Sequence, residues 1–587
     1  FGDLVTMQWW DDLWLNEGFA DWVTTKVQQE LHPELGADAR ARAEAYRTME
    51  NDALPSTRVV RQPVATTGQA IEAFDAITYQ KGSAVLGMLE GYLGAEPFQR
   101  AVREYLKAHA YGNARAEDLF AALGRASGRD VAAIAPTFLE HPGVPFVEVE
   151  PRCEAKELVV RQRGYRPLGL PAAPPPPWRL PLCVELGGAG RTCLEVAGSE
   201  VRAPLPACPP WTYANAGNRG YHVFSPTDGA VLAREALATL GPLGRIALLA
   251  SAWAGVRSGA REPAALVDVL RALDGEQDPA VLEHVLYTLR RARRTFVTDA
   301  ASGARFRAFA AARLAAARAR YFGRGLGPDG RAPRLATAAD RQAATTVLTA
   351  LLDIAEDEAL LREANTVARA WLAGPAKVDA DLGPVAVIYA SRRAGPARVD
   401  ELLAALPKAK TPVERTTLLR ALFAFRDEAA LARALPFTLD PRFRAQDIVQ
   451  LEAAAAPRDG DGDHYRVLWS WAQAHWPELT KKFAGRLALR LLTLTEGACS
   501  DEVRRPIEAF LAAQGARLEG ASRPLLLEAE RAKACIALRQ AKASAFQAAV
   551  ADGAPRSPGA AAKTPGTAAA AGAAAKTPGT AAAASPR

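Results

Sequence analysis

The stretch WLNEGFADW, residues 14–22, places a single glutamate between two tryptophans in an apolar segment. A carboxylate is costly to bury unless it is paired with a cation or bound to a metal ion. Glu17 is therefore a candidate metal ligand of a kind that zinc accepts. A second interpretation stays open, in which Glu17 is a charge in the first turn of a helix and is stabilised by the helix dipole.

Two polar neighbours lie close to Glu17 on the same predicted helix. Asp21 follows one turn later and could orient a metal-bound histidine through a hydrogen bond. The alternative is that Asp21 is an ordinary solvated charge. Asn16 is interpreted as a structural residue and not as a group that contacts substrate.

A catalytic zinc commonly takes two histidines and one glutamate, and it leaves a position open for water. The histidines come from H-E-x-x-H on one helix, where the intervening glutamate is the general base. The stretch FGDLVTMQWWDDLWLNEGFADW, residues 1–22, resembles the segment that follows this helix in the gluzincin aminopeptidases, the aminopeptidase N family. In that family the third zinc ligand is a glutamate in the context N-E-G.

The spacing agrees with the resemblance. In the family H-E-x-x-H-Q-W runs directly into F-G, and eighteen residues separate the second histidine from the zinc-binding glutamate. In this sequence the sixteen residues from Phe1 to Asn16 precede Glu17, and the missing Gln-Trp would bring the spacing to eighteen. The resemblance therefore implies that Glu17 is a zinc ligand. Because the chain starts with Phe1 and not Met, we also expect an N-terminal part carrying H-E-x-x-H to be missing from it.

A second specific segment is FDAITYQKGSAVLGMLEGYLG, residues 74–94. It resembles the family segment whose tyrosine stabilises the tetrahedral transition state, and this implies that role for Tyr79. The alternative is a core aromatic residue. The family resemblance continues in order through PWRLPLCVEL, WTYANAGNRGYHVF and VLWSWAQAHWPEL. Two departures are His222, where the family usually has Tyr or Arg, and STRVVRQP, which replaces a serine-histidine-proline segment.

Several parts of the family's active site are absent from this sequence. Its histidines have no spacing of four, and they are His32, His109, His141, His222, His284, His464 and His475. The G-x-M-E-N segment, which recognises the substrate's free amino end in the family, is missing too. One ligand cannot hold a catalytic zinc tightly. We therefore expect the intact parent protein to be the enzyme and this chain alone to be inactive.

Composition divides the chain into four parts. Residues 1–148 mix aromatics with helical periodicity, including one predicted helix over about 71–93, and resemble the end of the thermolysin-like domain. Residues 149–225 contain short β-like runs and predict a small β-sandwich. Residues 226–550 are rich in Ala, Leu and Arg and predict a HEAT-like helical domain. Residues 551–587 repeat AAAKTPGTAAAA and predict a disordered tail. The predicted fold class is multidomain and mainly α.

Charge and hydropathy exclude two classes of partner. The net charge is +7, from 72 basic and 65 acidic residues, and the basic residues are scattered without interleaved aromatics, so the sequence predicts no nucleic-acid partner. No uninterrupted apolar run reaches the roughly 18 residues of a membrane helix. The acidic run DGDGD, 459–463, lacks the glycine and glutamate that an EF-hand needs at its sixth and twelfth positions, so it is interpreted as a loop.

Four of the six cysteines lie in the β-like region. Cys183 and Cys193 flank GGAG and would face each other in a hairpin, within reach of a bond. Four cysteines allow three pairings, and the sequence does not choose between a Cys183–Cys193 bond and bonds from these two to Cys153 and Cys208. Reduced buried thiols are the alternative. Disulfides favour a periplasmic or extracellular protein over a cytoplasmic one.

These observations predict a zinc metallo-aminopeptidase that removes N-terminal amino acids from peptide substrates. One zinc ion is the expected cofactor. The alternatives are a non-catalytic aminopeptidase-like scaffold and an epoxide hydrolase of the same family.

Overall fold

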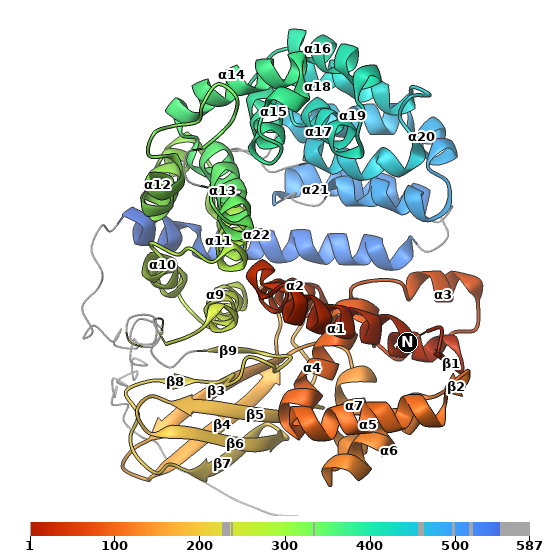
Figure 1. Cartoon of the computed structure of the whole chain (residues 1–587), viewed down its shortest axis with the longest axis vertical. Coiled ribbons are helices and arrows are strands. Elements are labelled where there is room, and N and C mark those ends of the chain that lie inside the picture. The colour runs from red at the N-terminus through yellow and green to blue at the C-terminus, as the bar shows by residue number, and fades with distance from the viewer. Residues whose placement is uncertain are drawn as a thin grey trace, which may run out of the picture. The chain divides into compact units, whose positions relative to one another are not determined.

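Helices dominate the N-terminal part of the computed structural model, up to the first long β-strand (Figure 1). Its elements are β1 (Val5–Met7), α1 (Trp14–Leu31), α2 (Ala37–Asp52), α3 (Thr67–Glu72), a π-helix (Ile77–Lys81), α4 (Gly82–Leu93), α5 (Ala95–Ala108), β2 (Gly112–Ala114), α6 (Ala116–Ser127) and α7 (Val131–Leu139). The short strands β1 and β2 pair in parallel and bring the start of the chain beside the end of α5.

The structure describes residues 2–551 except 176, 226–234, 236, 238, 333–334, 456–462, 496–498 and 516–520. The predicted tail, apart from Ala551, lies outside the described residues. Positions 459–462 of the predicted acidic loop also lie outside them. Residues Phe1–Gly553 form one compact unit. Within the described part of the chain, no helix is both long and apolar enough to cross a membrane.

The single helix predicted over 71–93 is wrong in one respect, because the structure divides it. α3 ends at Glu72, the π-helix occupies Ile77–Lys81, and only then does α4 begin. The apolar spacing that predicted the helix holds within α4, where Val85, Leu86 and Leu89 are fully buried.

Polar side chains cause the interruption. The carboxylate of Asp75 accepts the backbone N–H of Ile77 at 2.9 Å. The hydroxyl of Thr78 donates to the carbonyl of Ala73 at 2.5 Å. These bonds satisfy backbone groups that a continuous α-helix would use internally, so the chain can break there without leaving them unpaired.

The β-strands follow, in two antiparallel-rich sheets. They are β3 (Pro145–Arg152), β4 (Glu157–Gly164), β5 (Arg179–Leu186), β6 (Gly190–Ala197), β7 (Glu200–Pro204), β8 (Thr212–Tyr213) and β9 (Val223–Ser225). One sheet has the order β7-β4-β3-β9 and the other β6-β5-β8. Gln162 of β4 donates to the carbonyl of Val196 in β6 at 3.1 Å and so ties the two sheets together.

All six cysteines are paired in disulfides. Strands β5 and β6 form an antiparallel hairpin with Cys183 directly opposite Cys193, and the two are bonded. This confirms the predicted hairpin and the predicted oxidation of both cysteines, and it selects one of the pairings that the sequence leaves open. The structure also joins Cys153 to Cys208, and a third bond joins Cys499 to Cys535.

The rest of the described chain is helical. Its helices are α9 (Pro242–Arg257), α10 (Pro263–Ala272), α11 (Pro279–Phe296), α12 (Ala300–Phe322), α13 (Ala338–Ala350), a π-helix (Leu351–Ala355), α14 (Glu358–Ala373), α15 (Leu382–Arg392), α16 (Ala397–Ala405), α17 (Pro412–Phe423), α18 (Glu428–Ala434), 3-10 helices at Leu435–Leu439, Ala445–Ala455 and Gly485–Thr495, α19 (Asp463–Ala474), α20 (Trp476–Lys482), α21 (Asp501–Gly515) and α22 (Ser522–Ala551). Neighbours along the chain pack on one another, as α14 does on α15.

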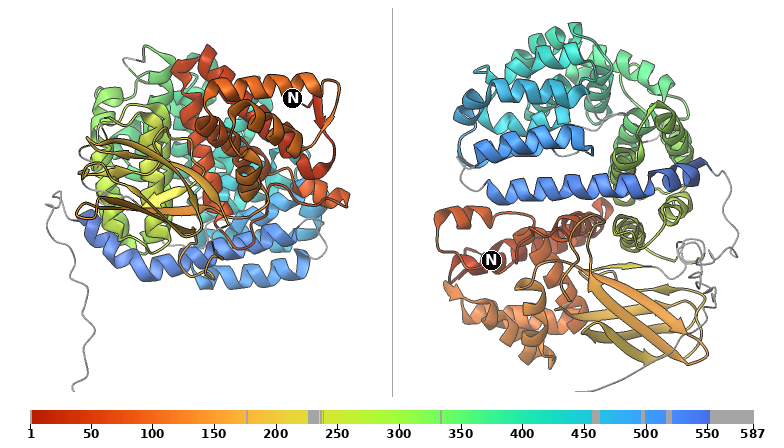
Figure 2. Two further views of the ribbon diagram at one scale, coloured as in Figure 1. Left: turned by 90° about the horizontal axis from the view of Figure 1, so that it is seen from below. Right: turned by 180° about the vertical axis from the view of Figure 1, so that it is seen from behind.

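Helix α22 connects this helical part to the N-terminal part. In two opposite views it lies between the red N-terminal helices and the later helices of the chain (Figure 1 and Figure 2). Arg531 of α22 donates to the side chain of Asn51 at 3.0 Å, and Glu530 accepts the hydroxyl of Ser56 at 2.6 Å. Helix α22 therefore braces the end of α2 and the segment that follows it.

Candidate functional site

Helix α1 places Glu17 in its first turn, where a negative charge is favourable. Trp14 and Phe19 are fully buried, so α1 turns that apolar face to the core. Glu17 is half-buried, and its carboxylate makes no hydrogen bond or ion pair with any residue that the structure describes. A half-buried carboxylate without a protein partner fits the candidate ligand of the sequence analysis.

Asn16 has a structural contact, as its sequence context predicts. Its side-chain oxygen accepts the backbone N–H of Met7 at 3.1 Å. The Met7 carbonyl in turn accepts the side chain of Asn113 at 3.2 Å. Asn16 therefore fixes the end of β1 against the start of α1.

Two glycines allow α1 and α4 to cross with their backbones in contact. A Cβ atom on Gly18 would lie 3.1 Å from the Cα of Gly82, and one on Gly82 would lie 3.4 Å from the Cα of Gly18. Gly18 directly follows Glu17 in the chain, and Gly82 lies three residues after Tyr79. The crossing thus brings together the two segments in which the sequence places candidate site residues.

Tyr79 lies on the π-helix at this crossing. Its side chain is half-buried, and the π-helix is in contact with α1. Short π-helical segments are rare and occur frequently at functional sites. The position suits a side chain that must face a ligand while its backbone is held in the core.

Asp21 is bonded to the neighbour of Tyr79. The Gln80 side chain donates to its carboxylate at 3.2 Å. Burial raises the pKa of Asp21 above its ordinary value; the Gln80 hydrogen bond opposes the rise, and the charge of Glu17 adds to it. The interpretation of Asp21 as an ordinary solvated charge is therefore wrong, because the residue is half-buried and links α1 to the π-helix.

A cavity of about 400 Å³ opens beside Asp21 and Gln80. Neither Glu17 nor Tyr79 is among the residues that line it. The cavity is a neighbour of the crossing and does not by itself define the candidate site.

Asp75 anchors the start of the π-helix from two sides. Arg58 donates to its carboxylate at 2.5 and 3.2 Å, and Arg523 of α22 donates to it at 2.5 Å. Arg58 also donates to the hydroxyl of Thr78 at 2.6 Å. Arg58 belongs to STRVVRQP, the departure from the family pattern, so this segment still supports the Tyr79 region. Sequence reasoning missed these positioning residues because no local signal joins them.

Lys81 anchors the other end of the π-helix. Its ammonium donates to Asp52 at 2.8 Å, and both side chains are fully buried. Asp52 also accepts the hydroxyl of Tyr221 at 3.0 Å and the backbone N–H of Gly143 at 3.0 Å. The buried pair joins α2 and the π-helix to the segments that precede β3 and β9.

The described residues do not form a complete zinc site. Among them, no group of three histidine, cysteine, aspartate or glutamate side chains could hold a metal ion. His222 is buried, its Nε2 lies 2.7 Å from the Ala214 carbonyl, and burial lowers its pKa to about 4. It is a core histidine.

Residues 1–138 match the model of the Peptidase family M1 domain. Residues 211–534, more than half of the chain, match the model of the ERAP1-like C-terminal domain. The chain belongs to the M1 peptidase family. This family membership confirms the predicted fold class, a mainly helical multidomain chain with an M1 peptidase segment, small β-sheets and an ERAP1-like helical domain.

Individual M1 relatives match most of the chain. Aminopeptidase M1-A of Oryza sativa subsp. japonica is 27% identical over 533 residues, which cover 87% of this chain and 58% of the rice protein. Aminopeptidase 2 of Candida albicans is 24% identical over 527 residues, which cover 87% of this chain and 55% of the yeast protein. The chain thus spans little more than half the length of these M1 relatives.

A shorter match to another M1 relative has a higher identity. Probable M1 family aminopeptidase 1 of Encephalitozoon cuniculi is 36% identical over 203 residues, 34% of this chain and 23% of its own length. The M1 family is a family of metallopeptidases.

Proposed function

We propose that this chain is part of a zinc-dependent aminopeptidase that removes amino acids from the N-termini of peptides. Membership of the M1 family supports the reaction class. The observation that carries the proposal is the contact of Gly18 with Gly82, because it joins the N-E-G segment to the segment that carries Tyr79. The relatives that match most of the chain are named aminopeptidases.

In this proposal Glu17 is one zinc ligand. Its half-buried carboxylate has no partner among the described residues, and its place in the first turn of α1 holds it at the crossing. Zinc, when bound in such enzymes, polarises the scissile carbonyl and lowers the pKa of water. One carboxylate does not hold zinc tightly, so we propose that this chain by itself is inactive.

Tyr79 is the proposed donor to the oxyanion. When a peptide carbonyl becomes tetrahedral, its oxygen gains negative charge, and a hydroxyl aimed there gains most at that moment. The donor must be held in place before the reaction. Asp75 and Lys81 fix the two ends of the π-helix, and so they would keep the Tyr79 backbone in position.

The four segments predicted from the sequence have separate proposed roles. Residues 1–148 would be the later part of the catalytic domain, 149–225 a β-sandwich, 226–550 a helical domain that limits access to peptide ends, and 551–587 a tail. The bond from Arg523 to Asp75 supports a role for the helical part at the site, because it joins α22 to the π-helix segment.

Aminoacyl-anilide hydrolysis by the whole protein tests the proposal, with an epoxide substrate measured in parallel. We expect zinc-dependent anilide hydrolysis and no epoxide opening. A whole protein that binds zinc but opens only the epoxide would establish the epoxide hydrolase. A whole protein that binds no zinc and acts on neither substrate would establish the scaffold.

A further inference from the structure

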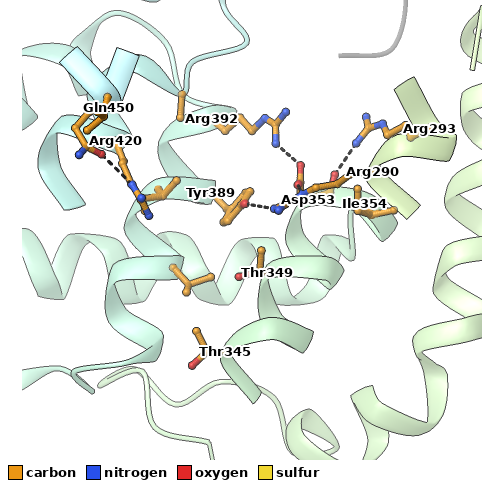
Figure 3. A pocket seen from close by; sticks show the side chains of 14 residues that line it. Arg290, Arg293, Thr345, Thr349, Asp353, Ile354, Tyr389, Arg392, Arg420 and Gln450 are labelled. Carbon is orange, nitrogen blue, oxygen red and sulfur yellow. Dashed lines mark hydrogen bonds and ion pairs between the residues drawn. The ribbon is translucent and has the colours of Figure 1, made fainter. Parts of the chain in front are cut away.

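The helical C-terminal part contains a cavity of about 550 Å³ (Figure 3). It lies among α11, α15, α17 and the π-helix Leu351–Ala355. Its size falls in the range of roughly 300–1,000 Å³ that is usual for small-molecule sites. The cavity shares no residue with the proposed aminopeptidase site.

Positive charge dominates the lining of this cavity. The four arginines that line it are Arg290, Arg293, Arg392 and Arg420, and one carboxylate lies among the lining residues. That carboxylate, Asp353, accepts Arg290 at 2.8 Å through one oxygen and pairs with Arg392 through the other. The lining thus holds four guanidinium groups and one carboxylate, an excess of three positive charges.

A second carboxylate, that of Glu356, lies next to Arg293 but does not line the cavity, and it does not remove this excess of positive charge. Arg293 is almost fully buried and donates to Glu356 at 3.1 Å. Glu356 also pairs with Arg393 and Arg426, at 2.6 and 2.8 Å. Arg393 and Arg426 do not line the cavity, and their positive charges balance the negative charge of Glu356. Glu356 therefore adds no net negative charge to the lining.

Two of the arginines keep unused donors. Arg420 donates through Nε to Gln450 at 3.0 Å and has no ion pair within the described part of the chain. Arg290 uses Nε on Asp353 and Nη2 on the hydroxyl of Tyr389, at 2.8 Å each. A guanidinium carries five N–H donors in a planar fork that fits a carboxylate or a phosphate. In Figure 3 the Tyr389 side chain is seen between these two arginines.

Apolar side chains form another part of the lining, which also includes Thr345 and Thr349. Ile354, Val385 and Ile388 line the cavity beside the arginines. Ile354 and Asp353 both lie on the second π-helix, and such segments occur frequently at functional sites. An apolar wall next to unused guanidinium donors suits a ligand with an anionic group on an apolar body.

We propose that this cavity binds a small organic anion, a carboxylate or a phosphate carried on an apolar body, between Arg290 and Arg420. The anion offsets the excess positive charge, and the two arginines supply the N–H donors. Ile354 and its apolar neighbours contact the body of the ligand.

Calorimetry on the 587-residue chain with phenyl phosphate, phenylacetate and benzyl alcohol tests this proposal. We expect saturable binding of at least one of the two anions at one site per chain, and no binding of the neutral alcohol. The anion that binds more tightly identifies the ligand as a phosphate or a carboxylate. The absence of binding by both anions, or equal binding of the alcohol, would overturn the proposal.

Substitutions of Arg420 test whether the anion binds in this cavity. Arg420→Gln removes an exposed side chain without an ion pair, so the fold should survive, and we expect the affinity to fall at least about tenfold, the loss expected for one charge-assisted hydrogen bond. Arg420→Glu should abolish binding. The matched control is Arg433→Gln, whose arginine pairs with Asp400 on the surface, and it should bind as the parent chain does. Unchanged affinity in both Arg420 variants would contradict the site.

Discussion

Gly18 of α1 lies against Gly82 at the start of α4, so closely that a methyl group on Gly18 would stand 3.1 Å from the Cα of Gly82. Neither glycine has a positive φ, so neither is required for an unusual backbone conformation. What the crossing requires is the absence of a side chain. The same contact determines how the Glu17 segment meets the Tyr79 segment.

Gly18→Ala should therefore destabilise the chain although alanine is the better helix former. The added methyl group meets backbone atoms that cannot turn away, and overpacking of this kind costs about 1–3 kcal/mol. Urea unfolding, followed by circular dichroism, measures the effect. The control is Gly87→Ala on α4, where nothing lies within 4 Å of the added Cβ and a small stabilisation is expected. Equal stability of the two variants would refute the close crossing.

The buried pair of Lys81 and Asp52 gives a second prediction. Lys81→Met should cost about 3–5 kcal/mol, because it leaves a fully buried carboxylate without its cation. The double variant with Asp52→Asn should be more stable than Lys81→Met alone, since the remaining group is neutral. Lys107→Met, at an exposed position of α5, is the control and should change little. A double variant less stable than Lys81→Met would show that charge burial is not the cause.

Asp75 predicts how stability changes with pH. Burial raises the pKa of Asp75, but the charges and hydrogen bonds of Arg58 and Arg523 outweigh burial and lower it below its ordinary value. In the unfolded chain this carboxyl takes up a proton at higher pH than in the folded chain. Its contribution to stability is therefore present above about pH 4 and is lost as the pH falls through the folded pKa.

The comparison of the parent chain with Asp75→Asn measures this contribution. At neutral pH the parent should unfold at the higher urea concentration. The gap between the two midpoints should shrink as the pH is lowered from about 5 to about 3. A gap that stays constant over this range would mean that the Asp75 charge does not stabilise the π-helix segment.

The disulfides give a prediction that needs no variant. Mass spectrometry of the unreduced protein after proteolysis should find Cys183 linked to Cys193, Cys153 to Cys208 and Cys499 to Cys535. Free thiols at Cys183 and Cys193 would contradict the hairpin pairing.

Local patterns predicted part of this molecule well. The GGAG turn between Cys183 and Cys193 predicts a hairpin, and hairpin geometry alone places the two cysteines opposite each other. The α1 helix and the place of Glu17 in its first turn follow from a short stretch of sequence for the same reason. In each case the contacts that decide the structure lie within a few residues.

Other features depend on contacts between distant segments. At the interruption of the helix predicted over 71–93, Asp75 is held by Arg58 and Arg523, and Arg523 lies 448 residues away in the chain. Lys81 would be expected on the surface until Asp52 is known to lie beside it. Helical periodicity carries no information on such distant partners, so the π-helix that contains Tyr79 could not be predicted from it.

We propose that Tyr79 stabilises charge in the transition state at a zinc site that includes Glu17. Steady-state kinetics and zinc analysis of the whole protein, with Tyr79→Phe beside Glu17→Ala, test it most directly. The controls are Tyr111→Phe and Glu30→Ala, both at exposed positions, which should behave as the parent does. We predict that Tyr79→Phe lowers kcat by about 100- to 1,000-fold while KM and zinc content stay nearly unchanged, and that Glu17→Ala loses the zinc. A Tyr79→Phe variant with the parent's kcat, or a Glu17→Ala variant with full zinc content, would contradict the account.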